Sequence, residues 1–187
     1  MKIASLSAAL VMLGFSLAAV TSPIRSAPAQ QFTSAVTPLL DAAAGKTVGS
    51  LAPGAALDVV GQSGSATHVT LHGWYAAGST AIVYGFPDKH VVTLSGFTGH
   101  ATAGAAQAVT VDGWVATNAL VADVQTVWKA AATLYAQKCS QCHALQPVNS
   151  YSANQWPAIM KTQQDNAALD PGQAALILTY LQIQSGH

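Results

Sequence analysis

Cys139-Ser140-Gln141-Cys142-His143 is the stretch of this sequence with the most specific consequence for the fold. The chain contains two cysteines in all, and both lie in this stretch. It matches the haem-attachment pattern C-x-x-C-H, because two thiols three positions apart can each add to one vinyl group of the same macrocycle. The imidazole that follows is then presented to the iron. The motif predicts one covalently attached haem c, bound by Cys139 and Cys142, with His143 as an axial ligand.

Three other chemistries fit this motif less well. A structural zinc site needs four thiolate or imidazole ligands in a closed geometry, and only Cys139, Cys142 and His143 are clustered. A thioredoxin-like redox pair follows a strand and opens a helix, whereas this motif follows a helical pattern that ends at Lys138. A plain disulfide leaves His143 without a role. Haem attachment is therefore the favoured interpretation.

The second axial position of the iron separates an electron carrier from a ligand-binding haem. Met160 is the single methionine beyond the N-terminal segment, and a thioether ligand favours reduced iron and raises the potential. Alternatively, Met160 only fills a gap in the core. Four histidines of the preceding region would instead give bis-histidine ligation and a lower potential, although each is individually expected to be solvated or hydrogen-bonded: His68, His72, His90 and His100. An open site, or one blocked by glutamine, is the third alternative.

Three helices are predicted in the last third of the chain. Val124 to Lys138 carries apolar residues at spacings of three and four, as on one face of a helix. Ser152 to Pro157 resembles a capping box with a proline in the first turn. Asp170 to about Gln184 begins with an N-cap residue and a proline at the first helical position. Residues 123–187 are therefore predicted to form an all-α domain around the loop that carries the motif.

Residues 46–122 carry short alternating apolar runs separated by glycine and proline, which is typical of short antiparallel strands. Val69 to Ala76 (VTLHGWYA) recurs 40 residues later as Val109 to Ala116 (VTVDGWVA). A fixed offset indicates that one supersecondary unit is used twice. Strands that end in Gly-Trp are typical of small SH3-like barrels in bacterial exported proteins. We expect Trp74 and Trp114 to be core residues rather than a ligand platform.

The first 29 residues are predicted to be a secretory signal peptide. Lys2 precedes an uncharged run from Ile3 to Val20, and Ala27-Pro28-Ala29 forms an A-x-A cleavage site. An uncleaved membrane anchor is the alternative, which the length of the run barely allows. No second apolar stretch is long enough to span a bilayer, so we expect a soluble periplasmic protein with no stable membrane span after cleavage.

The mature chain is poor in charge. Removing Lys2 and Arg25 leaves five basic and seven acidic side chains, so the net charge is slightly negative before haem propionates are counted. Nucleic-acid binding is not expected, because it needs clustered basic side chains. Residues 30–45 begin polar and become alanine-rich, and they are expected to form either a short leader or one helix from Thr37 to Ala44.

A family resemblance becomes specific around the motif. Leu134-Tyr135 and Tyr180-Leu181 resemble the first and last helices of a minimal class I cytochrome c, which cross beside the haem. Further positions resemble the C-terminal, monohaem part of the cytochromes that serve trimethylamine-N-oxide-type reductases: Cys139 to Pro147, Tyr151, Gln155 to Pro157 and Tyr180 to Gln182. In those relatives an SH3-like stretch with Gly-Trp motifs precedes the monohaem module, and the axial methionine lies about one turn further on, near Gln163. Their multihaem membrane-anchored half has no counterpart in this sequence.

The resemblance implies an α+β fold, with a small SH3-like antiparallel β-barrel over 46–122 and a minimal all-α cytochrome c domain over 123–187. It implies a periplasmic carrier, not an enzyme, that passes single electrons between a respiratory donor and a periplasmic oxidoreductase. The implied partner is a redox protein such as a molybdenum-containing reductase or dehydrogenase. A haem-based ligand sensor with an open or exchangeable sixth site is the alternative. A third interpretation makes the Gly-Trp repeat a cell-wall or partner-binding module.

Overall fold

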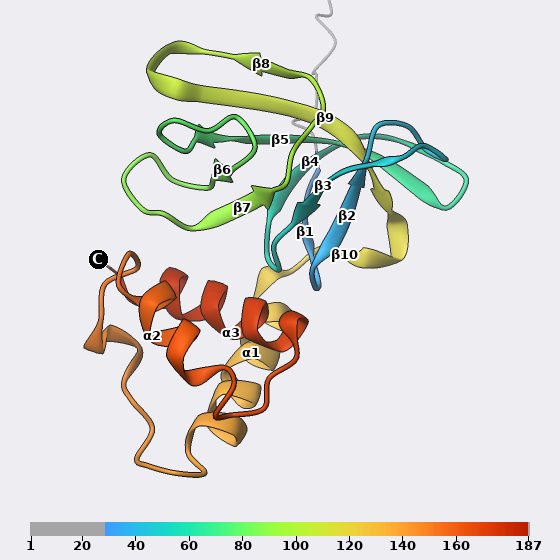
Figure 1. Cartoon of the computed structure of the whole chain (residues 1–187). Coiled ribbons are helices and arrows are strands. Elements are labelled where there is room, and N and C mark those ends of the chain that lie inside the picture. Colours follow the sequence, from blue (N-terminus) through green and yellow to red (C-terminus); the bar gives the residue numbers. More distant parts are fainter. Residues whose placement is uncertain (1–28, 187) are drawn as a thin grey trace, which may run out of the picture.

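A computed structural model describes residues 29–186 as a strand-rich layer above a helical layer (Figure 1). The predicted signal peptide lies outside the described residues except for Ala29. Ten strands come first: β1 (Gln30–Thr33), β2 (Thr37–Leu40), β3 (Thr47–Leu51), β4 (Ala56–Ser63), β5 (Ala66–Tyr75), β6 (Val83–Tyr84), β7 (Val92–Ser95), β8 (Ala101–Ala103), β9 (Ala108–Ala116) and β10 (Leu120–Val121). Three helices follow: α1 (Val124–Cys139), α2 (Trp156–Gln163) and α3 (Pro171–Gln184).

Six strands close into an antiparallel barrel. Their order is β5-β6-β7-β3-β2-β9, and β9 pairs back onto β5 to complete the ring. The sheet continues beyond β5 through β4, β1 and β10, and beyond β9 through β8. Closure leaves no free strand edge within the six-stranded ring, and the outer edges of the whole sheet are the short strands β8 and β10. The predicted α+β fold, a small barrel followed by a helical region, is confirmed.

Residues 30–45 are part of this sheet. β1 pairs with β4 and β10, while β2 pairs with β3 and β9. In β2 the buried residues Thr37 and Leu39 alternate with the exposed Pro38, as a strand with one face on a core requires. The helix expected from Thr37 to Ala44 is therefore wrong. Pairing with two neighbouring strands outweighs the local alanine content, and the alanines fall in the turn after β2.

The two copies of the internal repeat are β5 and β9, and they pair with each other. Val69 lies opposite Gly113, and Gly73 lies opposite Val109. Under the 40-residue offset each of these pairs maps onto the other, so a local two-fold axis relates the two strands. The two copies of the repeat therefore close the barrel by pairing with each other, and they do not form two separate supersecondary units.

The glycine of each Gly-Trp pair lies where another element crosses closely. A Cβ added to Gly113 would lie 2.6 Å from Cδ1 of Leu39 in β2. A Cβ added to Gly73 would lie 2.5 Å from Cγ1 of Val83 in β6. The same position in both copies of the repeat thus lies too close to a neighbouring strand to carry a side chain. Glycine is the residue that permits this close approach.

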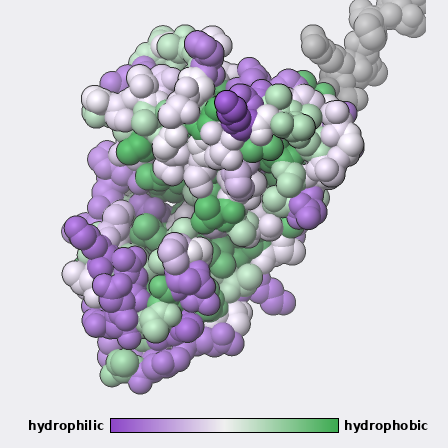
Figure 2. Space-filling model, turned by 45° about the vertical axis from the view of Figure 1, so that its right-hand side comes forward, coloured by the Kyte–Doolittle hydropathy of each residue, from purple (hydrophilic) through white to green (hydrophobic). Residues whose placement is uncertain are grey.

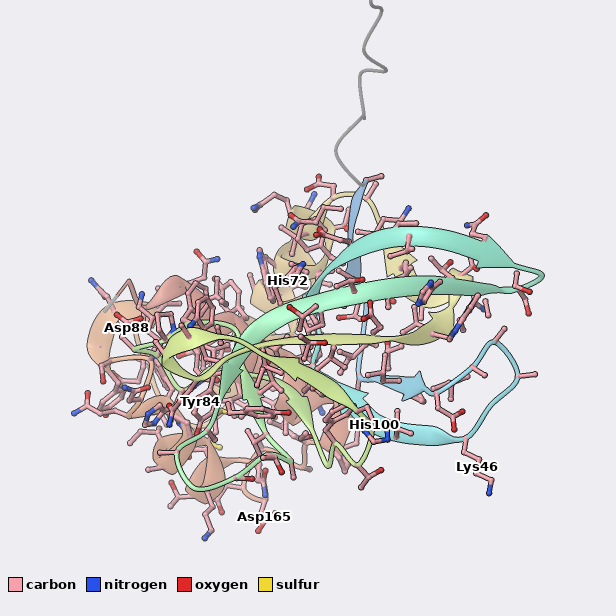
Figure 3. All side chains as sticks on the ribbon, turned by 90° about the horizontal axis from the view of Figure 1, so that it is seen from above. Lys46, His72, Tyr84, Asp88, His100 and Asp165 are labelled. Atoms are coloured by element: carbon pink, nitrogen blue, oxygen red, sulfur yellow. The ribbon has the colours of Figure 1, made fainter. Side chains whose placement is uncertain are left out.

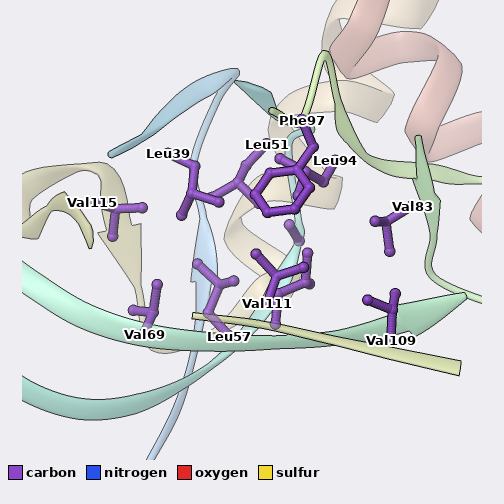
Figure 4. Packing of buried hydrophobic residues seen from close by; sticks show 12 residues of the cluster. Leu39, Leu51, Leu57, Val69, Val83, Leu94, Phe97, Val109, Val111 and Val115 are labelled. Atoms are coloured by element: carbon purple, nitrogen blue, oxygen red, sulfur yellow. The ribbon is translucent and has the colours of Figure 1, made fainter. Parts of the chain in front are cut away.

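The barrel core is aliphatic, and the tryptophans lie at its margin. Its buried cluster, shown in Figure 4, consists of Leu39, Leu51, Ala55, Leu57, Val69, Leu71, Val83, Leu94, Phe97, Val109, Val111 and Val115. Trp74 and Trp114 are only partly buried, and the Trp114 ring stacks on His68 at 4.8 Å between centroids. The expectation that both tryptophans are core residues is wrong, because strand alternation gives the inner face to their neighbouring glycines.

The helical layer packs against the barrel through α1 and α3. Trp128 of α1 is 7% exposed and covers Gly54, which has a φ of +74° in the loop between β3 and β4. Any side chain at Gly54 would collide with the indole ring. Figure 2 shows hydrophobic side chains gathered between the two layers and hydrophilic ones over the outer side of the helices. None of the helices in residues 29–186 is long and apolar enough to cross a bilayer.

Gly113→Ala is expected to lower the free energy of unfolding by about 1–3 kcal/mol, because the added methyl overlaps the buried Leu39 side chain. Gly61→Ala in β4 is the matched control, since nothing lies within 4 Å of a Cβ added there. We expect the control to change stability by no more than about 1 kcal/mol in either direction. Urea unfolding followed by circular dichroism measures both variants, and equal midpoints would contradict the close crossing.

Candidate functional site

The predicted attachment motif begins on α1 and continues into the loop that follows. The side chain of Asp123 caps the helix by accepting a hydrogen bond from the Gln125 amide at 2.9 Å. Cys139 is the last residue of the helix, so the prediction of a helix from Val124 to Lys138 is confirmed with one additional residue. Lys138 lies in the last turn, where the helix dipole favours a positive charge.

A cavity of about 490 Å³ opens beside the motif. All four predicted site residues line it: Cys139, Cys142, His143 and Met160. The other lining residues are Tyr135, Lys138, Gln141, Gln146, Trp156, Ile159, Gln163, Asn166 and Ala167. The volume lies within the range of small-molecule and cofactor sites, about 300–1,000 Å³. Within the described part of the chain, this lining contains one ammonium group and no carboxylate.

The orientation of His143 leaves one ring nitrogen free for a metal. Its Nδ1 lies 2.7 Å from the carbonyl oxygen of Ala144. Because a carbonyl oxygen only accepts, Nδ1 carries a proton, and in the neutral imidazole Nε2 then keeps its lone pair. A hydrogen bond from the second nitrogen to a carbonyl is the usual way in which proteins orient a metal-binding imidazole. The residue therefore has the tautomer that an axial ligand needs.

The two thiols differ in their surroundings, although both are free. Cys139 is half-buried, and burial raises the pKa of its thiol. Cys142 is exposed, as is every other residue from 140 to 147, including the large apolar side chain of Leu145. An apolar macrocycle bound over this loop would cover surface that otherwise faces water. The surroundings of the thiols thus fit a haem joined at this loop.

Two side-chain hydrogen bonds hold the loop after the motif between α1 and α2. The Tyr135 hydroxyl donates to the Gln146 carbonyl oxygen at 2.7 Å, and Trp156 Nε1 donates to the Val148 carbonyl oxygen at 3.1 Å. Tyr135 was expected on the apolar face of this helix, beside the haem, but its hydrogen bond to the loop was not predicted. The sequence spacing indicates that Tyr135 faces the same side as the motif, because it lies one helical turn before Cys139.

The wall contributed by α2 carries the thioether. Met160 is 4% exposed and Trp156, one turn earlier, is 2% exposed, and both line the cavity. Gln163 lines it as well, so the place where the resemblance puts the axial methionine belongs to the same wall. A thioether and an amide are therefore the two candidate side chains that this helix offers as a second axial ligand.

The four histidines of the β region lie on the barrel and do not line this cavity. His68 and His90 stack on aromatic rings, and Nδ1 of His72 lies 3.2 Å from Thr110 Oγ1 within the sheet. Figure 3 places His72 and the exposed His100 among the strands and their connecting loops. In residues 29–186, His143 is thus the one imidazole of the cavity wall. No group of three or more His, Cys, Asp or Glu side chains in that range could hold a metal ion.

Two protein families match separate parts of the chain. The family described as TorC third cytochrome c domain matches residues 26–95, and the family described as dihaem cytochrome c matches residues 135–187. The first match covers part of the barrel and contains no cysteine. The second covers the motif, the cavity wall and the closing helix.

Curated relatives extend the same similarity. The cytochrome c-type proteins TorC of Escherichia coli O157:H7 and of Escherichia coli strain K12 are each 24% identical over 151 residues, which is 73% of this chain and 39% of theirs. The cytochrome c-type protein TorY of Haemophilus influenzae is 27% identical over 126 residues, 60% of this chain and 34% of its own. The chain thus spans about two fifths or less of the length of these relatives. No solved structure matches it.

These matches show that the chain is similar to TorC- and TorY-like cytochrome c domains, at modest identity. Such domains imply covalently bound haem c. The matches indicate a protein of electron transport, a carrier rather than an enzyme.

Tyr135→Phe is expected to lower stability at pH 8 by about 0.5–1.5 kcal/mol, because it removes the hydrogen bond to Gln146. Burial raises the pKa of the Tyr135 hydroxyl from 10.0 to about 12. Above pH 10 the unfolded chain therefore loses this proton first, so the contribution of the hydroxyl is present below pH 10 and is lost as the pH rises toward 12. The stability gap between parent and variant should narrow over this range.

Denaturant unfolding at pH 8 and pH 11 in the presence of a reductant measures this gap. Tyr180→Phe, which packs on the same cluster and keeps the bond to Gln146, is the matched control. A gap for Tyr135→Phe that is equal at both pH values would contradict the buried, hydrogen-bonded hydroxyl.

Proposed function

We propose that this protein is a periplasmic electron carrier with one haem c, attached to Cys139 and Cys142 and bound axially by His143 and Met160. The observation that carries the proposal is the single cavity wall where two thiols, an imidazole and a thioether meet. Each is the residue type that its role requires, namely thioether formation with the vinyl groups and axial ligation. When bound, the haem supplies one Fe(II)/Fe(III) couple.

The chain's own residues bind, orient and shield the group. His143 is oriented by its hydrogen bond to the Ala144 carbonyl, and the loop that carries it is held by Tyr135 and Trp156. Trp156 and Ile159 give the cavity an apolar wall that would face the haem. A low local dielectric disfavours the more highly charged oxidised iron, so the wall and the thioether of Met160 both favour a higher potential.

One haem per chain follows from the cysteine content. Covalent attachment at two vinyl groups uses two thiols, and the chain contains two. The match to dihaem cytochrome c covers residues 135–187, which contain one C-x-x-C-H motif. A second covalently attached haem would need a second cysteine pair, so we propose a monohaem protein despite the name of the matching family.

We propose that the partner is a redox protein, such as a molybdenum-containing reductase of the trimethylamine-N-oxide type. The TorC and TorY names of the relatives and the resemblance of residues 139–182 support this class. The exposed loop 140–147 beside Lys138 offers a small surface of low charge, and small contacts suit transient electron-transfer encounters. The predicted signal peptide supports a place outside the cytoplasm.

Covalent attachment is tested by mass spectrometry of the denatured protein after expression with haem-attachment machinery. The parent is expected to carry the added mass of one haem, and the double variant Cys139→Ala, Cys142→Ala is expected to carry none. Ser140→Ala is the control: it changes a residue of the motif that has no thiol, so this variant should keep the haem. A parent without covalent haem, or a double variant that retains it, would overturn the proposal.

Met160→Ala tests the second axial ligand. If the thioether binds the iron, the oxidised parent shows a weak charge-transfer absorption near the red edge of the visible spectrum, and the variant loses it. The midpoint potential is expected to fall, because histidine and methionine together raise it. Covalent haem should remain, since both thiols are intact. Gln163→Ala is the matched control on the same wall and should keep the parent's absorption and potential.

Carbon monoxide distinguishes the electron carrier from a ligand sensor. A ferrous parent that stays six-coordinate and resists carbon monoxide supports the carrier, because Met160 then occupies the sixth position. Rapid and complete binding at neutral pH would favour an exchangeable site and hence the sensor. A spectrum altered by Gln163→Ala and unaltered by Met160→Ala would move the axial assignment to the glutamine.

A further inference from the structure

Gln182 of α3 joins the barrel to the helical layer from a buried position. The residue is 3% exposed. Its Nε2 donates two hydrogen bonds, to the carbonyl oxygen of His90 at 3.1 Å and to the carbonyl oxygen of Ala153 at 2.8 Å. His90 lies in the barrel loop between β6 and β7, and Ala153 lies just before α2. One amide group therefore bonds both structural layers to the helix that carries it.

Asn154 completes the connection from the other side. Its Oδ1 accepts a hydrogen bond from the His90 amide at 2.7 Å, and its Nδ2 donates to the Asp88 carbonyl oxygen at 3.4 Å. Both backbone groups of His90 are thus bonded by side chains of the helical region. Figure 3 shows Tyr84 and Asp88 at the side of the barrel beside the helices, and the Tyr84 ring stacks on the His90 ring at 4.9 Å.

The segment that these bonds hold is the start of α2. Gln155 and Trp156 both donate their backbone amides to the Ser152 carbonyl oxygen, and no side chain caps the helix at Gln155. α2 has eight residues, too few to be stable without support from outside. The position of Ala153 and Asn154 therefore determines where α2 begins, and with it where Trp156 and Met160 meet the cavity.

A side chain that merely fills space could not replace Gln182. A leucine or methionine would occupy a similar volume, but it would leave the carbonyl groups of His90 and Ala153 without this donor. Ala153 is itself 0% exposed, so water has poor access to its carbonyl group. Buried carbonyl groups that lose their partner are strongly unfavourable, and the segment would shift to restore hydrogen bonds.

We propose that Gln182 is a positioning residue of the haem site, through which the barrel sets the place of α2 and keeps Met160 on the cavity wall. This inference rests on the proposed function. It makes the barrel a support for the second axial ligand instead of an independent module. Loss of the two hydrogen bonds should release the thioether more often without removing the ligand itself.

The test compares Gln182→Met with Gln184→Met in the full, haem-loaded chain. Gln184 is exposed on the same helix, so the same substitution there leaves the connection intact. Two quantities are measured: hydrogen–deuterium exchange of the α2 amides, and the rate at which imidazole binds to the ferric protein. For Gln182→Met we expect both to rise at least roughly tenfold, because two buried hydrogen bonds are lost, while Gln184→Met matches the parent.

Asn154→Ala is the second variant, because Asn154 is exposed and its replacement is compatible with folding. It removes the acceptor for the His90 amide, so both measured quantities should rise in the same direction by a smaller factor. If Gln182→Met does not fold, the two quantities measured for Asn154→Ala test the proposal instead. Unchanged exchange in α2 for the folded variants would overturn the proposed connection.

The remaining outcomes separate this inference from the proposed function. Faster exchange in α2 with unchanged imidazole binding would overturn the positioning role, whereas covalent haem and the methionine absorption of the parent would leave the proposed function standing. A lower unfolding midpoint alone, with both measured rates unchanged at 25 °C, would show a merely structural role and overturn the inference. A parent without haem would overturn both.

Discussion

The pairing of β5 with β9 is the interaction on which the rest of the architecture depends. It runs without a break from Ala66 opposite Ala116 to Trp74 opposite Ala108, and it converts an open sheet into a closed ring. Because the two strands are copies of one sequence unit, each brings a glycine to the position where a neighbouring element must approach. In the closed barrel the loop between β6 and β7 faces the helices, where His90 is hydrogen-bonded by Asn154 and Gln182.

The helical layer needs that contact because it is small. The described residues 123–186 contain one buried hydrophobic cluster of five side chains, and three of them, Tyr135, Trp156 and Met160, also line the cavity. Domains of fewer than about 70 residues seldom stabilise themselves by a single core and rely on a cofactor or another domain. Here the barrel supplies part of that support, because Trp128 of α1 packs on Gly54 and Gln182 of α3 bonds to His90. The proposed covalent haem would supply the rest.

The chemistry of the cavity follows from its few polar groups. Its wall combines two thiols, one imidazole and one thioether with aromatic and aliphatic side chains, and Lys138 is the one cation among the described lining residues. Such a wall can shield a flat apolar group while presenting soft and imidazole ligands to a metal. A site of this kind would tune an electron-transfer couple by ligand type and burial.

The sequence by itself determined the features that depend on neighbouring residues. The spacing of apolar residues located α1, and C-x-x-C-H predicted haem attachment at the end of that helix. Asp170 followed by Pro171 marked the start of α3, where the Asp170 side chain accepts a hydrogen bond from the Gln173 amide at 2.8 Å. Each of these signals acts over three or four positions along the chain, where geometry is set by the backbone alone. Local pattern was therefore sufficient. The capping box expected at Ser152 is wrong, because α2 begins at Trp156 and no side chain caps it.

Tertiary structure decided the features that depend on distant partners. Thr37 to Leu40 became a strand because β3 and β9 offered pairing on both sides, and Trp74 and Trp114 turned outward because Gly73 and Gly113 took the inner face. The role of Gln182 depends on His90, 92 residues earlier in the chain. Met160 reached the same wall as Cys139 only through the packing of α2, which no spacing in the sequence encodes. Contacts of this kind are determined by the closed barrel and the layer beneath it.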